Sequence, residues 1–390
     1  MRVLTVSNLY PPHALGGYEM SCADVMGRFS ARGHDVHVLT TTTRLDGIDD
    51  AAPGQAITVE RALDWYWQDH SIRRPGRWRA RQLDGTNRRR LRQTIDRVRP
   101  DVVSVWAMGG MSLGLLDTIR DVAVPSVWMV CDEWPIYGPK LDAWAAARGR
   151  AAPEPGAATI CWVSGYIRDR VRDVVGWQPA HQTVTGSGID PQDFPVRPAA
   201  DRPWRWRLLC VGRVEPRKGF TTAVEALARL PQQATLRIAG PDDGAHAADL
   251  HRIAVELGVG DRLTIAPVPR DQLAAVYTDA DAVLFTSGWK EPFGLVPIEA
   301  MACATPVVAA PTGGAVEFLD DGINCLAVPP KDTDAVVAAL VRLADDAPLR
   351  NRLVEGGQAT ASTYTVDRLA DLLERWHLAA AARFADGEPA

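Results

Sequence analysis

The sequence predicts an α/β protein made of two doubly wound domains, each built on a parallel sheet. Two observations carry this prediction. Short apolar runs alternate with segments of helical periodicity, which is typical of a parallel sheet covered on both faces. The alternation also occurs in two series of strands and helices, and a stretch rich in Pro, Asp and Arg at 191–203 separates them. A length of 390 residues agrees with two or three domains.

The first series opens as strand, loop and helix. Residues 3–6 form a short apolar run, a Pro- and Gly-rich loop spans 8–17, and apolar residues recur at helical spacing from Met20 to Phe29 until Gly33 ends the helix. The further elements expected are strands 36–39, 101–106, 126–130 and 160–163, a helix through 91–98, a helix at 111–122 and a helix capped by Ser164 that continues to Val174.

The second series repeats the pattern after the linker. The elements expected are strands 206–211, 234–238, 263–266, 282–285 and 307–309 and helices 221–230, 245–257, 272–277 and 297–303. An Ala- and Leu-rich helical region follows Pro330. We therefore predict an N-terminal domain at 1–195, a C-terminal domain at 196–365, and a helix at 366–390 that packs back on the N-terminal domain. Such sheets bind ligands at the carboxyl ends of their strands, so we expect the two domains to face each other across a deep cleft.

Composition excludes several classes of protein. With 46% apolar residues the chain is neither disordered nor fibrous, and a net charge of −5 argues against a nucleic-acid partner. No apolar run approaches the roughly 20 residues that span a bilayer. The opening MRVLTVSN lacks the regions of a signal peptide, so we expect a cytoplasmic protein with six reduced cysteines.

A first candidate site follows the predicted strand at 206–211. The run GRVEPRKG places Arg213 and Lys218 in a turn just before a helix. Two fixed cations and a helix N-terminus suit a diphosphate. The alternative is a solvated basic turn, and the run is not a Walker loop because GxxxxGK[ST] is absent.

Two further segments of the second domain have features of an anion site. In KEPFGLVPIEAM, Glu291 lies in a loop and Glu299 lies about one turn into a helix. The two carboxylates could therefore bind two parts of one ligand. The backbone N–H groups of Phe293, Gly294 and Leu295 precede that helix and could face an anion. In the run APTGGA, Gly313 belongs to a glycine pair between a strand end and a helix start.

Taken jointly, these runs resemble family 4 glycosyltransferases, which have the GT-B fold of two Rossmann-like domains around a cleft. Glu291 and Glu299 match the family's Glu-x7-Glu motif, and Arg213 and Lys218 match its diphosphate-binding cations. The N-terminal run SNLYPPHALGGYE is similar to the family's glycine loop, with Gly16 and Gly17 near the donor phosphate. SGIDPQDF resembles its hinge segment, with Ser187 where Asn is usual.

The resemblance implies a retaining, nucleotide-sugar-dependent hexosyltransferase of carbohydrate or natural-product biosynthesis. Arg213, Lys218 and helix N-termini would stabilise the leaving diphosphate, so no metal or other cofactor is expected. Glu291 would orient the donor sugar and Glu299 would bind the ribose. The nucleobase would be read by backbone groups near Val268.

Acceptor recognition is expected in the first domain, where the chain departs from the family. Relatives often carry a His-Asp pair where this chain has Cys131 and Asp132, and that His commonly touches the donor sugar. We take Cys131, Asp132 and Trp134 as candidates on the acceptor side. The acceptor class stays open between a small molecule, a glycan and a lipid-linked molecule.

Two other features of the sequence allow more than one interpretation. Residues 61–99 hold 12 Arg against four Asp with interleaved aromatic residues, which suits peripheral docking on anionic lipid, an anionic or aromatic acceptor pocket, or a solvated helical face. Asp279-Ala280-Asp281 has the form of a metal-binding DxD, but it lies between a helix and a strand, so we expect no metal there. The alternatives to the transferase are a non-catalytic sugar-nucleotide-binding protein and another GT-B enzyme of epimerase type.

Overall fold

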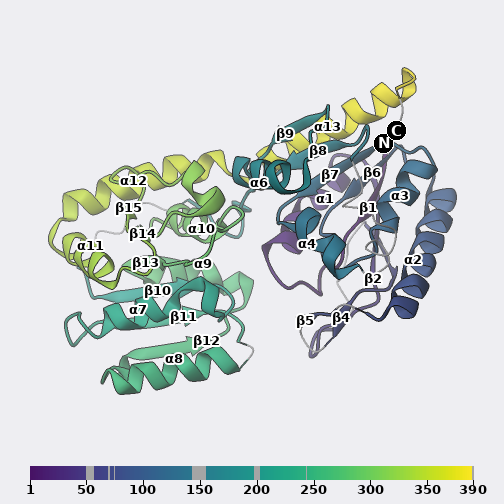
Figure 1. Cartoon of the computed structure of the whole chain (residues 1–390). Coiled ribbons are helices and arrows are strands. Elements are labelled where there is room, and N and C mark those ends of the chain that lie inside the picture. Colours follow the sequence, from purple (N-terminus) through teal and green to yellow (C-terminus); the bar gives the residue numbers. More distant parts are fainter. Residues whose placement is uncertain are drawn as a thin grey trace. The chain divides into compact units, whose positions relative to one another are not determined.

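The structure is a computed structural model of the chain. It describes residues 1–49, 57–68, 71–73, 75–142, 155–196, 203–242 and 244–388. The chain folds into two compact units (Figure 1): unit 1 comprises Met1–Ser187 and Val366–Ala390, and unit 2 comprises Gly188–Thr365. The boundary after Ser187 lies a few residues before the one expected at 195.

Unit 1 is built on a parallel sheet. Its strands have the order β3-β2-β1-β6-β7-β8-β9, and every adjacent pair runs parallel, with Val3 of β1 opposite Val36 of β2 and Val102 of β6. The strands are β1 (Arg2–Val6), β2 (Asp35–Thr41), β3 (Thr58–Leu63), β6 (Val102–Val105), β7 (Ser126–Val130), β8 (Thr159–Trp162) and β9 (Gln182–Val184). A separate antiparallel pair consists of β4 (Trp67–Gln68) and β5 (Ser71–Ile72).

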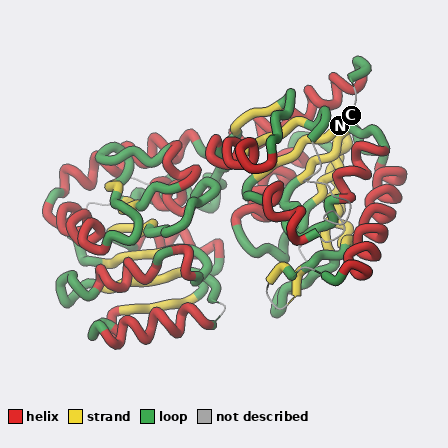
Figure 2. The backbone as a smooth tube through the Cα atoms, viewed as in Figure 1, coloured by secondary structure: helices red, strands yellow, loops and turns green. Residues whose placement is uncertain are grey.

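Helices cover this sheet, as Figure 2 shows. They are α1 (Gly17–Ala31), α2 (Arg77–Val98), α3 (Gly114–Asp121), α4 (Trp134–Leu141), α6 (Gly165–Val175) and α13 (Val366–Ala385). α2 packs with α3 and contacts β1, β2 and β3, whereas α1 packs with α13, which contacts β6, β7 and β8.

The C-terminal helix α13 belongs to unit 1 although it follows unit 2 in the sequence. Arg32, the C-cap of α1, forms ion pairs with Asp371 and Glu374 at 2.5 Å, and the Phe29 ring meets the His377 ring edge-on at 5.3 Å. The buried face of α13 consists of Val366, Leu369, Ala370, Leu373, His377 and Ala380. Exposed ion pairs contribute little, so apolar burial is the main force that holds α13 in place.

Unit 2 repeats the architecture with a parallel sheet of order β12-β11-β10-β13-β14-β15. Its strands are β10 (Arg207–Val211), β11 (Thr235–Ala239), β12 (Leu263–Ala266), β13 (Ala282–Phe285), β14 (Val307–Ala309) and β15 (Leu326–Ala327). Its helices are α7 (Phe220–Leu227), α8 (Ala245–Glu256), α9 (Arg270–Asp279), α10 (Leu295–Ala302), α11 (Thr333–Asp345) and α12 (Ala347–Thr363), with 3-10 turns η1 (Pro216–Lys218), η2 (Gly260–Arg262) and η3 (Gly313–Glu317).

Each sheet has one point where the strand order reverses direction. In unit 1 this point lies between β1 and β6, and in unit 2 it lies between β10 and β13. The loops that follow the two strands at such a point turn to opposite faces of the sheet. This leaves a crevice at the carboxyl ends of the strands, where doubly wound sheets bind ligands. The loops after β10 and β13 therefore form the place in unit 2 to look for a site.

One buried histidine makes the stability of unit 1 depend on pH. Burial lowers the pKa of His377 from 6.5 to about 4, and its Nδ1 bonds with the Leu373 carbonyl at 2.7 Å. A depressed histidine pKa contributes stability above pH 6.5 that is lost as the pH falls toward 4. We predict that the free energy of unfolding decreases by about 3 kcal/mol over this range from His377 alone.

Urea unfolding at pH 7.5 and pH 4.5 measures this dependence. His377→Gln should reduce the difference by about the contribution of His377, while His251→Gln, at an exposed position of unit 2, should retain it. An equal pH dependence in wild type and His377→Gln would contradict the prediction.

Candidate functional site

The loop after β10 is shaped by a short turn and by close contact with the loop after β13. It runs through Arg213 and the 3-10 turn η1 to Gly219, which precedes α7. Gly219 has φ +70°, and a Cβ there would lie 2.0 Å from the carbonyl oxygen of Thr286. Only glycine fits this close approach of two backbones.

Hydrogen bonds fasten the same two loops together. The N–H of Gly288 donates to the Arg217 carbonyl at 3.1 Å, and the Thr286 hydroxyl donates to the Gly219 carbonyl at 3.0 Å. The Arg217 guanidinium lies 4.6 Å from the centre of the Trp289 ring, a cation–π contact. The loops therefore form one framework at the carboxyl ends of β10 and β13.

This framework brings two of the predicted catalytic residues into contact. Lys218 Nζ lies 2.8 Å from Glu291 Oε1, and the Ser287 hydroxyl donates to the same oxygen at 3.0 Å. The Glu291 side chain is only 7% exposed and that of Lys218 22% exposed. Arg213, the third, is half-exposed and its Nη2 lies 3.8 Å from Glu215 Oε1.

The start of α10 adds backbone donors beside Glu291. Among the described residues, no acceptor receives a hydrogen bond from the N–H of Phe293, Gly294 or Leu295. These groups stand at the positive end of a helix dipole. The Phe293 side chain turns inward, with its ring 5.2 Å from Phe318.

The glycine pair at 313–314 supports the Glu291 backbone. A Cβ on Gly313 would lie 2.2 Å from the Glu291 carbonyl oxygen, and the N–H of Gly314 donates to that oxygen at 2.7 Å. The helix expected after this pair is the 3-10 turn η3. Gly313 thus lies against the loop that carries Glu291.

Glu299 occupies a partly buried position in the first half of α10. Its Oε2 accepts a hydrogen bond of 2.6 Å from the hydroxyl of Tyr277 on α9. Burial raises the pKa of Glu299 above its ordinary value, and the Tyr277 hydroxyl opposes that rise. Val268 lies half-buried in the loop between β12 and α9.

In unit 1 the predicted glycines begin α1. Gly16 is its N-cap, and the Gly16 N–H donates to the Glu19 carboxylate at 3.0 Å. Gly17 is the first helical residue, and both glycines are exposed. The next residue, Tyr18, ties this loop to the end of β7, because its hydroxyl donates to the Met129 carbonyl and accepts from the Cys131 N–H at 3.2 Å.

The acceptor-side candidates form a turn between β7 and α4. One Asp132 oxygen accepts from the Trp134 N–H at 3.0 Å and the other accepts from the Tyr137 hydroxyl at 2.8 Å. Cys131 is partly exposed, and burial raises the pKa of its thiol. Trp134 is wholly buried with its ring 5.8 Å from that of Trp177, so in this structure it offers no face to a sugar.

Both aspartates of the DxD at 279–281 bond to other residues of unit 2. Asp281 accepts hydrogen bonds of 2.9 Å from the backbone N–H groups of Arg205 and Arg207, and Asp279 pairs with the Arg207 side chain. Over the part of the chain that the structure describes, no group of three His, Cys, Asp or Glu residues is placed to hold a metal ion.

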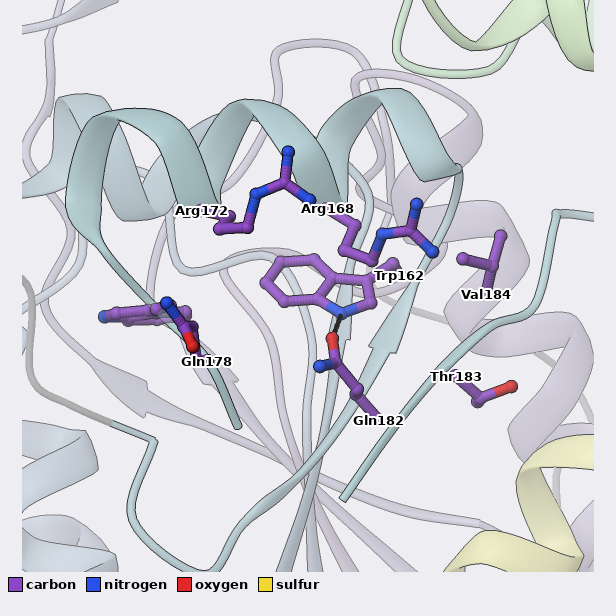
Figure 3. Close-up of a pocket in the computed structure, with 8 residues that line it drawn as sticks. Trp162, Arg168, Arg172, Gln178, Gln182, Thr183 and Val184 are labelled. Carbon is purple, nitrogen blue, oxygen red and sulfur yellow. Dashed lines mark hydrogen bonds between the residues drawn. The ribbon is translucent and has the colours of Figure 1, made fainter. Parts of the chain in front are cut away.

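A cavity of about 320 Å³ lies in unit 1 between α6, β8 and β9. Figure 3 shows Arg168 and Arg172 beside the indole of Trp162, whose N–H donates to Gln182 at 2.8 Å. Both arginines pair with Asp169 at 2.9 Å, and Trp162 is buried. None of the predicted site residues lines this cavity.

Family models match both units. The model for Glycosyltransferase Family 4 matches residues 15–193, and that for Glycosyl transferases group 1 matches residues 200–360. The chain belongs to glycosyltransferase family 4. The loops after β10 and β13 lie in unit 2, within the residues that the group 1 model matches.

Curated relatives match this family 4 chain over different lengths. D-inositol 3-phosphate glycosyltransferase of Stackebrandtia nassauensis is 35% identical over 51% of this chain and 49% of its own, so the chain spans about half the length of that relative. Glycogen synthase of Mycobacterium tuberculosis is 28% identical over 97% of this chain and 95% of its own.

Solved structures share the GT-B fold. Sucrose-phosphate synthase from Thermosynechococcus elongatus superposes with a TM-score of 0.79 at 21% identity, covering 99% of this chain and 100% of its own. HepE of Anabaena, solved in complex with UDP-glucose, superposes with a TM-score of 0.73 at 20% identity, covering 96% of this chain and 98% of its own.

Two residues that contact the candidate glutamates were not predicted from the sequence. Ser287 contacts Glu291 from four residues upstream, and its place in the same Gly- and Pro-rich loop was a signal that could have found it. Tyr277 contacts Glu299 from another helix, and no spacing rule connects positions 22 residues apart.

We predict that Gly313→Ala is more destabilising than Gly322→Ala. Both glycines have positive φ, +60° and +72°, so each alanine should cost about 1–2 kcal/mol of backbone strain. Nothing lies within 4 Å of a Cβ at 322, whereas a Cβ at 313 meets the Glu291 backbone. Displacing that backbone should cost about 1–3 kcal/mol more. Urea unfolding of both variants measures the difference, and equal losses of stability would contradict the prediction.

Proposed function

We propose that this family 4 member transfers a sugar from a nucleoside diphosphate sugar to an acceptor hydroxyl, with retention at the anomeric carbon and without a bound metal. The observation that supports this most is the contact of Lys218 with Glu291 beside the N-terminus of α10. A cation, a carboxylate and backbone donors meet there at the strand-order reversal of unit 2.

The chemical task of the site is to stabilise the leaving diphosphate. Negative charge grows on the phosphate oxygens as the bond to the sugar breaks. Lys218 and Arg213 supply two positive charges, and the N–H groups at 293–295 supply donors that need no rearrangement. In this proposal these fixed groups stabilise the negative charge of the leaving diphosphate in place of a divalent cation.

The two glutamates take different parts of the donor. Glu291 lies within reach of the Lys218 ammonium, so a phosphate held by Lys218 would place the attached sugar hydroxyls near the Glu291 carboxylate. Glu299 would hold the ribose, and backbone groups near Val268 the base. Gly16 and Gly17 at the start of α1, together with Gly313, would approach the donor with little steric bulk.

Retention follows from a front-face route in this proposal. The acceptor hydroxyl attacks on the face from which the diphosphate leaves, and a leaving phosphate oxygen takes its proton. Glu291 orients the sugar and forms no covalent bond to it. HepE is solved with UDP-glucose, which makes UDP-sugars the first donors to try.

We predict that Lys218→Met weakens UDP binding by roughly ten- to a hundredfold, because one charge-assisted hydrogen bond to phosphate contributes about 1.5–3 kcal/mol. Calorimetric titration with UDP measures this, with GDP, TDP and ADP as competing nucleotides. Lys140→Met is the matched control, since Lys140 is exposed at the end of α4 in unit 1. Equal affinity in both variants would remove Lys218 from the donor site.

The alternatives give different outcomes with the same proteins. Slow hydrolysis of the nucleotide sugar that Glu291→Ala abolishes supports the transferase. Tight nucleotide binding without turnover for any acceptor supports a binding protein, and an altered sugar on intact nucleotide supports an epimerase-like enzyme. Turnover that survives a chelator, with the product's anomeric configuration read by NMR, tests metal independence and retention.

We also propose that α2 docks unit 1 on an anionic lipid surface. The helix contains eight Arg and two Asp, and one of these, Asp84, is buried. Trp78, Arg81, Arg89 and Arg92 are all exposed and fall on the side of α2 away from its buried residues. Trp78 is 85% exposed, and a tryptophan among arginines suits the boundary between headgroups and acyl chains. No helix in the described ranges is both long and apolar enough to cross a bilayer.

We predict that the protein sediments with vesicles containing phosphatidylglycerol and not with pure phosphatidylcholine vesicles, and that added salt releases it. Trp78→Ala should weaken binding several-fold through lost apolar burial. Val255→Ala, at an exposed apolar position of unit 2, should leave binding unchanged. Equal binding to both lipids would contradict a charged docking face.

A further inference from the structure

Tyr277 and Glu299 form a hydrogen-bonded pair between two helices of unit 2. Tyr277 lies near the end of α9 and its side chain is wholly buried. Its hydroxyl donates to Glu299 Oε2 at 2.6 Å, the usual distance for a hydroxyl bound to a carboxylate. No described residue forms a hydrogen bond with the other carboxylate oxygen of Glu299.

The rest of Tyr277 is fixed independently of this hydroxyl. Its backbone carbonyl accepts from the Thr305 hydroxyl at 2.7 Å, and its ring meets the Phe194 ring edge-on at 6.0 Å. The phenol oxygen is therefore held rigidly, and it fixes one oxygen of a glutamate whose own side chain has three rotatable bonds. The Glu299 carboxylate then has one defined orientation on α10.

Burial and the charge of Asp193 raise the pKa of Glu299, while the Tyr277 hydroxyl and Arg270, at the first position of α9, oppose that rise. The Arg270 guanidinium also donates to Asp193 at 2.7 Å and lies 5.8 Å from the Phe194 ring centre. An ionised carboxylate with one oxygen bound by Tyr277 presents the other oxygen as an acceptor for ligand hydroxyls.

We infer that Tyr277 is a positioning residue for nucleotide recognition: it holds Glu299 so that its second oxygen binds the ribose hydroxyls of the donor. This inference rests on the proposed role of Glu299 in the donor site. Tyr277 does not touch the nucleotide in this arrangement. Its effect is confined to how well the site distinguishes a ribose from a sugar that lacks the hydroxyls.

The test compares UDP with 2′,3′-dideoxy-UDP by calorimetric titration. The readout is the ratio of their dissociation constants, because a general loss of stability weakens both ligands alike and leaves the ratio unchanged. In the wild type we expect UDP to bind at least about tenfold more tightly, from one or two hydrogen bonds to a charged group. Glu299→Gln and Tyr277→Phe should each lower that ratio at least threefold, and the two changes together should lower it no further than Glu299→Gln alone.

Two controls keep the test independent of folding. Thr278→Val alters the neighbouring residue on α9, whose hydroxyl donates to the Ala274 carbonyl, and should leave the ratio at the wild-type value. If Tyr277→Phe does not fold, Tyr277→Met removes the hydroxyl and fills the space with a flexible apolar chain.

The outcomes separate the inference from the proposed function. A wild-type ratio near one would overturn both the ribose role of Glu299 and the inference. If the ratio of the two dissociation constants falls in Glu299→Gln but stays at the wild-type value in Tyr277→Phe or Tyr277→Met, the inference alone is overturned. A fall in both variants, with Thr278→Val unchanged, supports it.

Discussion

The candidate site depends on one constraint, which is the contact between the backbones that leave β10 and β13. Gly219 fits against the Thr286 carbonyl with no room for a side chain, and the N–H of Gly288 bonds with the Arg217 carbonyl. Main-chain contacts therefore bring Lys218 and Glu291 together, and the attraction between their charges is not needed to do so. A site assembled in this way is preorganised, since binding a ligand requires little ordering of the loops.

The buried ion pair is more informative about function than about stability. Removing a carboxylate and an ammonium from water costs about as much as their attraction returns, so a pair such as Lys218 and Glu291 adds little net stability. The Ser287 hydroxyl reduces the cost by bonding with the same carboxylate oxygen. Under the proposed function, a diphosphate would give Lys218 a second anionic partner, and Glu291 would keep acceptor capacity for sugar hydroxyls.

The sequence predicted the two parallel sheets because their strands are apolar and their helices periodic. The strands β3 and β9 and the helix α4 were not expected. α4 has the sequence WPIYGPKL, whose two prolines and glycine indicate a loop, yet tertiary contacts override that preference. β9 has only three residues and β3 alternates weakly, so neither carries a clear apolar signal. Arg213, Lys218 and Glu291 could be chosen as candidates because Gly and Pro mark the loops that carry them, whereas Tyr277 meets Glu299 only through the packing of two helices.

The two units differ in how much of their chemistry the sequence can reveal. A diphosphate needs fixed charges and backbone donors, and these stand in loops that glycine and proline mark. An acceptor is recognised by side chains, and packing decides which of them face solvent. Trp134 and Trp78 illustrate this: Trp134 is wholly buried in an aromatic cluster, whereas Trp78 is 85% exposed on α2. The sequence does not distinguish the two positions, so the structure and not the composition decides which tryptophan can contact a ligand.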